Sequence, residues 1–127
     1  MGLEQFRLDN QVAVVTGGGT GIGKAIALEF ARAGAHVALG SRKLPPLEAV
    51  ARAIRELDRR ALTVSVDVRN PDQVEQLVSR TLAEFGRLDI LVNNAGASFL
   101  SPVENITPNG WSAVVGTNLT GVFLCCR

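Results

Sequence analysis

Short apolar runs alternate along the chain with stretches in which apolar residues recur every three or four positions. The apolar runs predict β-strands over 12–15, 36–39, 62–68 and 89–93. The spaced stretches predict helices over 22–33, 47–57 and 71–85, and a last helical region over 107–127 with a break near Asn118. Strands joined by helices are typical of parallel sheets with right-handed crossovers. The pattern therefore predicts an α/β fold: a three-layer, doubly wound parallel sheet with strand order 3-2-1-4.

Local signals mark the ends of these helices. Gly34 is expected to close the first helix, and Pro45 and Pro46 are expected to precede the second. Asn70 has the side chain of an N-cap, and Gln73 stands at the position of its capping-box partner. These signals place the helix boundaries independently of the apolar spacing.

Composition limits the size and the class of the protein. The 127 residues are 46% hydrophobic and 20% charged, which favours one packed domain over 1–127. The pattern covers about half of a six- or seven-stranded doubly wound domain, and the sequence stops within a helical pattern, so we expect a truncated or partial domain. A net charge of +1 predicts no attraction to nucleic acid or to membranes. No leader or membrane span is predicted, and a cytoplasmic location is expected.

The two cysteines, Cys125 and Cys126, are adjacent, and no Cys or His spacing in the chain predicts a metal site. We expect both thiols to be buried as small hydrophobes. His36 begins a predicted strand and is expected to pack there or at its rim rather than to catalyse. We also expect core positions for apolar residues of the last helical region, Trp111, Val114, Val115 and Phe123.

The loop after the first predicted strand is rich in glycine. Residues 16–23 read Thr-Gly-Gly-Gly-Thr-Gly-Ile-Gly and lead directly into a predicted helix. Glycines let backbone N–H groups approach a pyrophosphate closely, and the helix N-terminus adds partial positive charge. A glycine string in this strand–loop–helix context predicts a dinucleotide site, whereas a loop that only turns tightly is the simpler alternative.

A second interpretation fits the same loop. Residues 18–24 match GxxxxGK, the start of a P-loop that binds ATP or GTP. Asp67 stands where a carboxylate near the metal would be expected. The next residue after Lys24, however, is Ala25, which lacks the hydroxyl that binds Mg²⁺ in such loops. A P-loop NTPase is therefore the weaker alternative.

The end of the second predicted strand indicates which dinucleotide is bound. NAD sites carry an acidic residue about 20 residues after the glycines, but this chain has no Asp or Glu between Glu29 and Glu48. Ser41 and Arg42 stand there instead. A hydroxyl and a guanidinium can hold the 2′-phosphate of NADP, so we predict a preference for NADP(H). The alternative is that Arg42 and Lys43 form only a solvated turn.

Four motifs together resemble the short-chain dehydrogenase/reductase family, whose members share a Rossmann fold. They are the glycine loop at 16–23, Asp67-Val68, Asn93-Asn94-Ala95-Gly96 and Asn118 in Thr-Asn-Leu. The resemblance covers essentially the whole chain. It implies an oxidoreductase that uses NADP(H), acts on a small-molecule substrate, and forms a homo-oligomer in full-length form.

The resemblance also implies roles for individual residues. The residues expected to contact the cofactor phosphates are Gly17, Gly21, Ile22 and Gly23. The 2′-phosphate faces Ser41 and Arg42, and the adenine borders Asp67 and Val68. The loop that lines the cofactor near its ribose contains Asn93, Ala95 and Gly96. Asn118 corresponds to the catalytic asparagine, which in the family holds a helix kink and a water of the proton relay. For Asn94 a structural role is the favoured interpretation.

A finer likeness concerns the substrate. Residues 93–102 and the GSRKL run at 40–44 are similar to the trans-2-enoyl-CoA and 2,4-dienoyl-CoA reductase branch, which reduces fatty acyl-CoA with NADPH. That likeness places Phe99, Leu100 and Ser101 near the substrate mouth, although Phe99 and Leu100 could simply pack the loop.

The chain departs from the family in one respect. The family's catalytic serine and its Tyr-xxx-Lys pair are expected after the next strand, beyond Arg127, and the chain contains no tyrosine. We therefore expect this chain to be the cofactor-binding half of the enzyme and, by itself, inactive. The rival hypothesis is a non-catalytic NADP-binding or subunit-interaction module.

Overall fold

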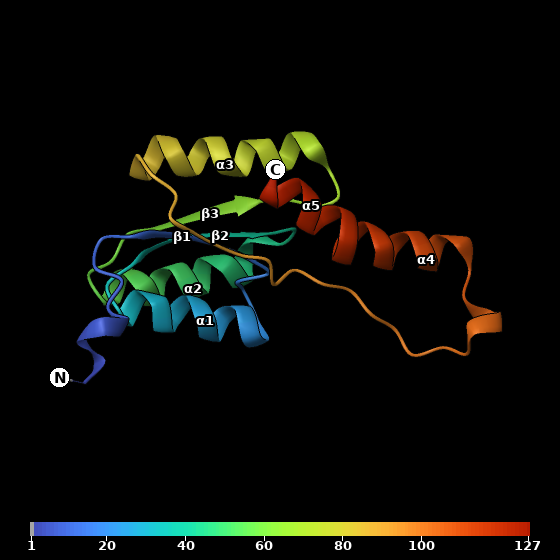
Figure 1. The fold of residues 1–127 in the computed structure, drawn as a ribbon, viewed down its shortest axis with the longest axis horizontal. Coiled ribbons are helices and arrows are strands. Elements are labelled where there is room, and N and C mark those ends of the chain that lie inside the picture. The colour runs from blue at the N-terminus through green and yellow to red at the C-terminus, as the bar shows by residue number, and fades with distance from the viewer. Residues whose placement is uncertain (1) are drawn as a thin grey trace.

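The computed structural model describes residues 2–127 and contains one four-stranded sheet (Figure 1). Its strands are β1 (Val12–Thr16), β2 (His36–Ser41), β3 (Ala61–Ser65) and β4 (Ile90–Val92). The strand order is β3-β2-β1-β4, and all three neighbouring pairs are parallel. The predicted α/β class, parallel sheet and strand order are confirmed.

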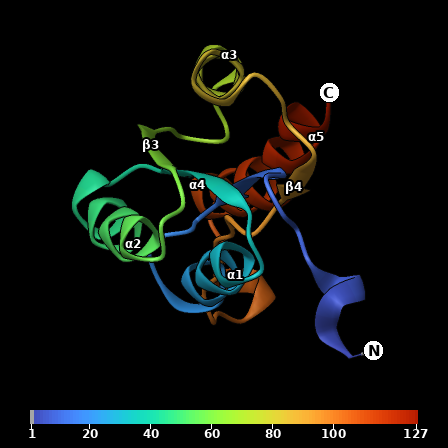
Figure 2. The same cartoon turned by 90° about the vertical axis from the view of Figure 1, so that its left-hand side faces the viewer.

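Helices cover both faces of the sheet (Figure 2). They are α1 (Gly21–Arg32), α2 (Leu44–Glu56), α3 (Pro71–Phe85), α4 (Pro108–Val115) and α5 (Gly121–Cys126). Helices α1 and α2 lie on one face, whereas α3 and α5 lie on the other (Figures 1 and 2). Between α4 and α5 the backbone forms a π-helical segment, Gly116–Thr120, and short 3₁₀ turns span Leu3–Phe6 and Val103–Asn105.

Alternate side chains of the central strands build two separate cores. Val15 of β1 and Leu39 of β2 pack with α1 and α2, whereas Val14, Ala38 and Val64 pack with α3. All five residues of β1 are buried, because a central parallel strand faces helices on both sides. This two-sided burial explains why the strands read as continuous apolar runs rather than as alternating patterns.

One helix start differs from the sequence expectation, and a second lacks one of its two expected capping bonds. Helix α2 begins at Leu44, so Pro45 and Pro46 lie within its first turn rather than before it; proline is tolerated there because first-turn N–H groups have no helical acceptor. Asn70 caps α3, accepting from the N–H groups of Asp72 (3.0 Å) and Gln73 (3.3 Å). The Gln73 side chain does not complete a capping box, because its Oε1 accepts from the Asp67 N–H at 2.7 Å.

The C-terminal region is less buried than the sequence pattern predicts. The break near Asn118 is confirmed as the π-helical segment. Of the four residues expected in the core, Trp111 and Phe123 are 65% and 61% exposed, and Val114 and Val115 are only partly buried. Leu124 and Cys125 pack on the side of this region that faces α3. Cys125 is half-buried and Cys126 is exposed, so the expectation for the thiols is wrong for Cys126. None of the helices within residues 2–127 is long and apolar enough to cross a membrane.

Candidate functional site

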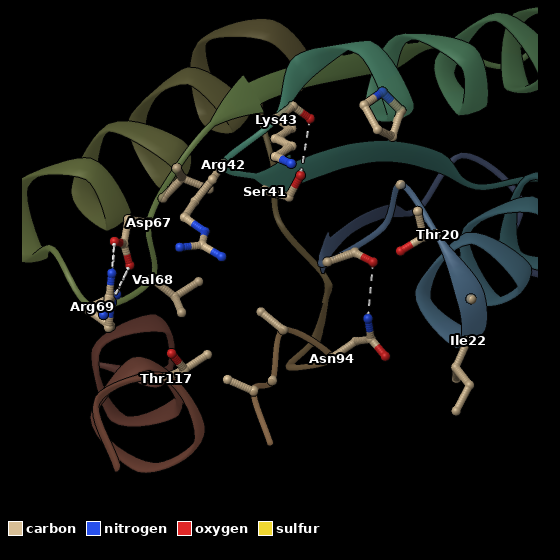
Figure 3. Close-up of a pocket in the computed structure, with 18 residues that line it drawn as sticks. Thr20, Ile22, Ser41, Arg42, Lys43, Asp67, Val68, Arg69, Asn94 and Thr117 are labelled. Carbon is tan, nitrogen blue, oxygen red and sulfur yellow. Dashed lines mark hydrogen bonds and ion pairs between the residues drawn. The ribbon is translucent and has the colours of Figure 1, made fainter. Parts of the chain in front are cut away.

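A cleft of about 630 Å³ opens where the carboxyl ends of the parallel strands meet (Figure 3). The loops after β1, β3 and β4 line it, together with the end of β2 and Thr117 of the π-helical segment. Predicted site residues that line it are Gly17, Gly21, Ile22, Ser41, Arg42, Asp67, Val68, Ala95 and Gly96. The carboxyl edge of a doubly wound sheet is where such folds bind ligands. Gly23, Asn93 and Asn118 do not line the cleft.

The glycine loop and the first residues of α1 line one side of this cleft. Gly17 and Gly21 adopt positive φ angles of 67° and 56°, which lets the chain turn sharply into α1. Thr20, the N-cap of α1, makes no side-chain capping bond, so no capping side chain occupies the first-turn amides, and Gly21 and Ile22 of this turn line the cleft. Such a helix N-terminus favours an anionic ligand.

Gly23 supports this loop from behind rather than lining the cleft. It is buried, and a Cβ at this position would lie 2.4 Å from the carbonyl oxygen of Gly17 and 2.4 Å from Nδ2 of Asn94. Only glycine allows the first turn of α1 to approach the loop this closely. The sequence analysis gave Gly23 a phosphate contact, whereas the structure shows it packed against Gly17 and Asn94 and not lining the cleft.

A buried threonine ties the glycine loop to the loop after β4. The hydroxyl of Thr16 is an acceptor for the N–H groups of Asn94 (3.1 Å) and Ala95 (3.0 Å), and it donates to the carbonyl of Val92 at 3.4 Å. The Asn94 side chain donates to the carbonyl of Gly17 at 3.1 Å. The structural role expected for Asn94 is thereby confirmed. The sequence analysis did not identify this role of Thr16. The feature that could have indicated it is a polar residue at the end of an otherwise apolar strand.

The end of β2 presents a free positive charge. Ser41 donates to the carbonyl of Lys43 at 3.3 Å, and Ser65 donates to the carbonyl of Arg42 at 3.1 Å, so the turn is held through its backbone. The Arg42 guanidinium extends toward Asp67 and Val68 (Figure 3) and makes no hydrogen bond to any of residues 2–127. An exposed guanidinium with unused donors is suited to a phosphate.

Asp67 and Arg69 form an ion pair on the opposite wall of the cleft. The Arg69 side chain donates from Nη2 to Oδ2 of Asp67 at 2.7 Å and from Nε to Oδ1 at 3.0 Å. The backbone N–H of Arg69 also donates to Oδ1, at 3.0 Å. This pairing lowers the pKa of Asp67 to about 2, so the carboxyl is ionised throughout the neutral range.

Asn118 uses its side chain to hold the loop after β4. Its Nδ2 donates to the carbonyl of Ala97 at 2.6 Å, and its Oδ1 accepts from the Ala97 N–H at 3.1 Å. The π-helical segment is thereby joined to the cleft wall, and Thr117, the residue before Asn118, faces the cleft (Figure 3). Both amide atoms of Asn118 therefore have structural partners.

Three further sequence predictions concern residues away from the cleft floor. The Asn93 side chain turns away from the cleft and donates to Sγ of Cys126 at 3.3 Å. Phe99 packs against Gly110, whereas Leu100 is fully exposed. His36 lies at the other end of β2, where its Nδ1 accepts from the Arg60 N–H at 2.9 Å, and burial lowers its pKa. The expectation that His36 packs rather than catalyses agrees with this position.

The geometry does not favour the P-loop interpretation. Lys24 is exposed on α1 and does not line the cleft, so it does not reach the position of a phosphate-binding lysine. Ala25 offers no oxygen ligand. Among residues 2–127, no group of three or more His, Cys, Asp or Glu side chains is placed to hold a metal ion.

Comparisons with known proteins agree with the dinucleotide interpretation. The sequence model of the short chain dehydrogenase family matches residues 11–127. The chain is 52% identical over 96 residues to an uncharacterized oxidoreductase of Mycobacterium tuberculosis, covering 76% of this chain and 36% of that protein. It is 36% identical over 120 residues to a probable 2,4-dienoyl-CoA reductase of Bacillus subtilis, with coverages of 94% and 47%. It is 41% identical over 121 residues to the rat peroxisomal 2,4-dienoyl-CoA reductase, with coverages of 94% and 41%.

Solved structures give the same result. A short-chain type dehydrogenase/reductase from Mycobacterium marinum superposes with a TM-score of 0.94 at 38% identity, covering 98% of this chain and 50% of that one. A short chain dehydrogenase from Burkholderia cenocepacia, in complex with NADP, gives a TM-score of 0.91 at 38% identity, with coverages of 94% and 49%. The chain spans about half the length, or less, of the relatives it matches. The glycine loop, the cleft at the strand ends and these likenesses lead to one conclusion: the chain belongs to the short chain dehydrogenase family.

Proposed function

We propose that the cleft binds NADP(H), and that the chain is the cofactor-binding part of an NADP(H)-dependent oxidoreductase. The observation that carries this proposal is the unpaired guanidinium of Arg42 in a cleft where the end of β2 has no carboxylate. A carboxylate there would repel a 2′-phosphate, whereas a guanidinium binds it through charge-assisted hydrogen bonds. The NADP in the Burkholderia structure, which this chain resembles, supports the same cofactor.

The residues present fit such a group. A Cβ at Gly21 would have no atom within 4 Å, so the loop leaves open space beside the backbone at the start of α1, whereas a Cβ at Gly17 would meet Nδ2 of Asn94 at 2.7 Å. We assign the phosphates to Gly17, Gly21 and Ile22, with Gly23 as their support. NADPH, when bound, supplies a hydride; the chain's own residues bind and orient it.

The remaining assignments follow the walls of the cleft. Ser41 and Arg42 are proposed to hold the 2′-phosphate, and Asp67 and Val68 to border the adenine. The ribose side is assigned to the loop after β4, with Asn93, Ala95 and Gly96. Asn118 is proposed as the catalytic asparagine of the whole protein, where its side-chain bonds to Ala97 keep the π-helical segment in place.

Arg42→Gln is expected to weaken NADPH binding about ten- to a hundredfold and to leave NADH binding within about twofold, because hydrogen bonds to a charged group contribute about 1.5–3 kcal/mol. The measurement is a fluorescence titration of the chain with each reduced cofactor. Arg52→Gln is the matched control, since Arg52 is exposed on α2 outside the cleft. Equal weakening of NADPH and NADH, or no change, would contradict the assignment of Arg42.

We propose that the whole protein transfers hydride to an enoyl-CoA or carbonyl substrate. The 2,4-dienoyl-CoA reductases among the relatives support a fatty acyl-CoA. The 127 residues include no tyrosine to serve as acid or base, so the chain alone is proposed to bind cofactor without turnover. Steady oxidation of NADPH by this chain with crotonyl-CoA would contradict that statement.

A second candidate, a subunit-interaction module, is favoured by one surface. Trp111, Leu119 and Phe123 are 65%, 67% and 61% exposed on the consecutive segments α4, Gly116–Thr120 and α5. Exposed apolar side chains of this size mark association surfaces. We propose that the protein forms a homo-oligomer through this region; light scattering that finds only monomer for the whole protein would exclude it.

A further inference from the structure

A negative charge shares the cleft with Arg42. The Asp67 side chain is 26% exposed, lines the same cavity and is ionised in the neutral range. An unpaired carboxylate at this place would weaken phosphate binding in two ways. It would repel the ligand's charge, and it would offer the Arg42 guanidinium a competing partner.

Arg69 covers that carboxylate. Its Nε and Nη2 contact both oxygens of Asp67, at 3.0 Å to Oδ1 and 2.7 Å to Oδ2, and its backbone N–H makes a further bond of 3.0 Å to Oδ1. Paired planar groups of this kind are both strong and geometrically specific. The Asp67 carboxylate is thereby neutralised by a neighbour on its own loop, and the Arg42 guanidinium is left unpaired.

The aliphatic stem of Arg69 lies beside the π-helical segment. Gly116, the first residue of the π-helical segment, lies against its aliphatic stem: a Cβ at Gly116 would be 3.0 Å from Cδ of Arg69. The stem therefore packs beside this segment, while the Arg69 side chain as a whole is 41% exposed. The ion pair keeps Arg69 on the Asp67 carboxylate, so the Arg42 guanidinium stays unpaired.

We propose that Arg69 is a positioning residue for cofactor selectivity: by occupying Asp67, it keeps the Arg42 guanidinium available for the 2′-phosphate of NADP(H). This inference rests on the proposed function. It assigns to Arg69 a task in discrimination between NADP(H) and NAD(H) without direct contact with the phosphate. A merely structural ion pair would instead affect both cofactors equally, through the shape of the adenine wall.

The test measures the dissociation constants of NADPH and NADH for the chain and for five variants, one of which is Arg42→Gln, and compares the ratio of the two constants. Arg69→Gln is expected to lower the preference for NADPH about tenfold, because the freed carboxylate pairs with Arg42. The double variant Asp67→Asn, Arg69→Gln is expected to restore the preference to within about twofold of wild type, because no carboxylate remains. Asp67→Asn alone is expected to retain the preference, and Arg52→Gln is the control.

The ratio of the NADH and NADPH dissociation constants distinguishes failure of this inference from failure of the proposed function. An unchanged preference in Arg69→Gln overturns the inference, and so does a lost preference that the double variant fails to restore. If Arg69→Gln is too unstable to titrate, the double variant and Asp67→Asn still test the role of Arg69. Loss of the preference for NADPH in either variant overturns that role. A wild-type chain without preference for NADPH, or an Arg42→Gln variant that keeps it, overturns the proposed function itself. Retained preference in Arg69→Gln with lost preference in Arg42→Gln overturns only the role of Arg69.

Discussion

Gly23→Ala is expected to lower the free energy of unfolding by about 3 kcal/mol and to abolish measurable cofactor binding, the largest effect of any single methyl group in the site. The added Cβ would lie 2.4 Å from the Gly17 carbonyl oxygen and 2.9 Å from its carbon, and these are backbone atoms of the loop itself. The loop cannot retreat easily, because the Asn94 side chain holds that same carbonyl. Urea denaturation followed by circular dichroism measures the loss of stability.

Gly21→Ala is the matched control for this change. It adds a methyl group to the same loop, but nothing lies within 4 Å of the new atom. Its positive φ of 56° adds a backbone penalty of about 1 kcal/mol. Equal stability of the two alanine variants would show that close packing at Gly23 does not support the loop.

Thr16→Val is expected to destabilise the chain by about 2–4 kcal/mol and to weaken cofactor binding, because it leaves the N–H groups of Asn94 and Ala95 without their acceptor. Thr16 is 1% exposed, so water cannot replace the hydroxyl without rearrangement. Valine keeps the shape of threonine, which confines the change to the lost hydrogen bonds. The measurements are urea denaturation and titration with NADPH.

Thr16→Ser provides the complementary control, since it keeps the oxygen and removes only a buried methyl group. That loss is expected to be about 1 kcal/mol. If the valine variant were as stable as the serine variant, the hydroxyl would not be what joins the glycine loop to the loop after β4.

The apolar pattern predicted the elements well because it reports burial. It failed where burial and sheet pairing differ. Val66 and Val68 are buried beyond the end of β3, so the apolar run predicts a strand that continues past Ser65. Gly40 and Ser41, in contrast, pair within β2 although neither is apolar. Strand ends are set by hydrogen bonding, which the pattern does not report.

The pattern failed for a different reason at the C-terminal end. Apolar residues were expected to lie in the core, but Trp111 and Phe123 are mostly exposed. Helical spacing shows that residues share a face; it does not show that anything in the chain covers that face. Only Leu124 and Cys125 of this region join the core beside α3.

The sequence predicted those parts of the site that depend on the strand order and on the glycine motif. The glycine loop and the strand ends converge as the topology requires, and Arg42 reaches the cleft. The partners of side chains could not be read from the sequence: Thr16 bonds across 78 and 79 positions, and Gln73 contacts Asp67 rather than its expected capping partner. Arg69 lies two residues after Asp67, a spacing that in a loop fixes no geometry.

The most direct test of the central claim is a ¹⁵N-resolved NMR titration of the chain with NADP⁺. The account predicts that the largest shifts fall on the amides of residues 17–23, 41–43, 67–69 and 94–97, which line the cleft or support its loops, and that NAD⁺ reproduces them except at residues 41–43. Shifts centred on the opposite edge of the sheet near His36, or shifts with magnesium-ATP and none with NADP⁺, would contradict it.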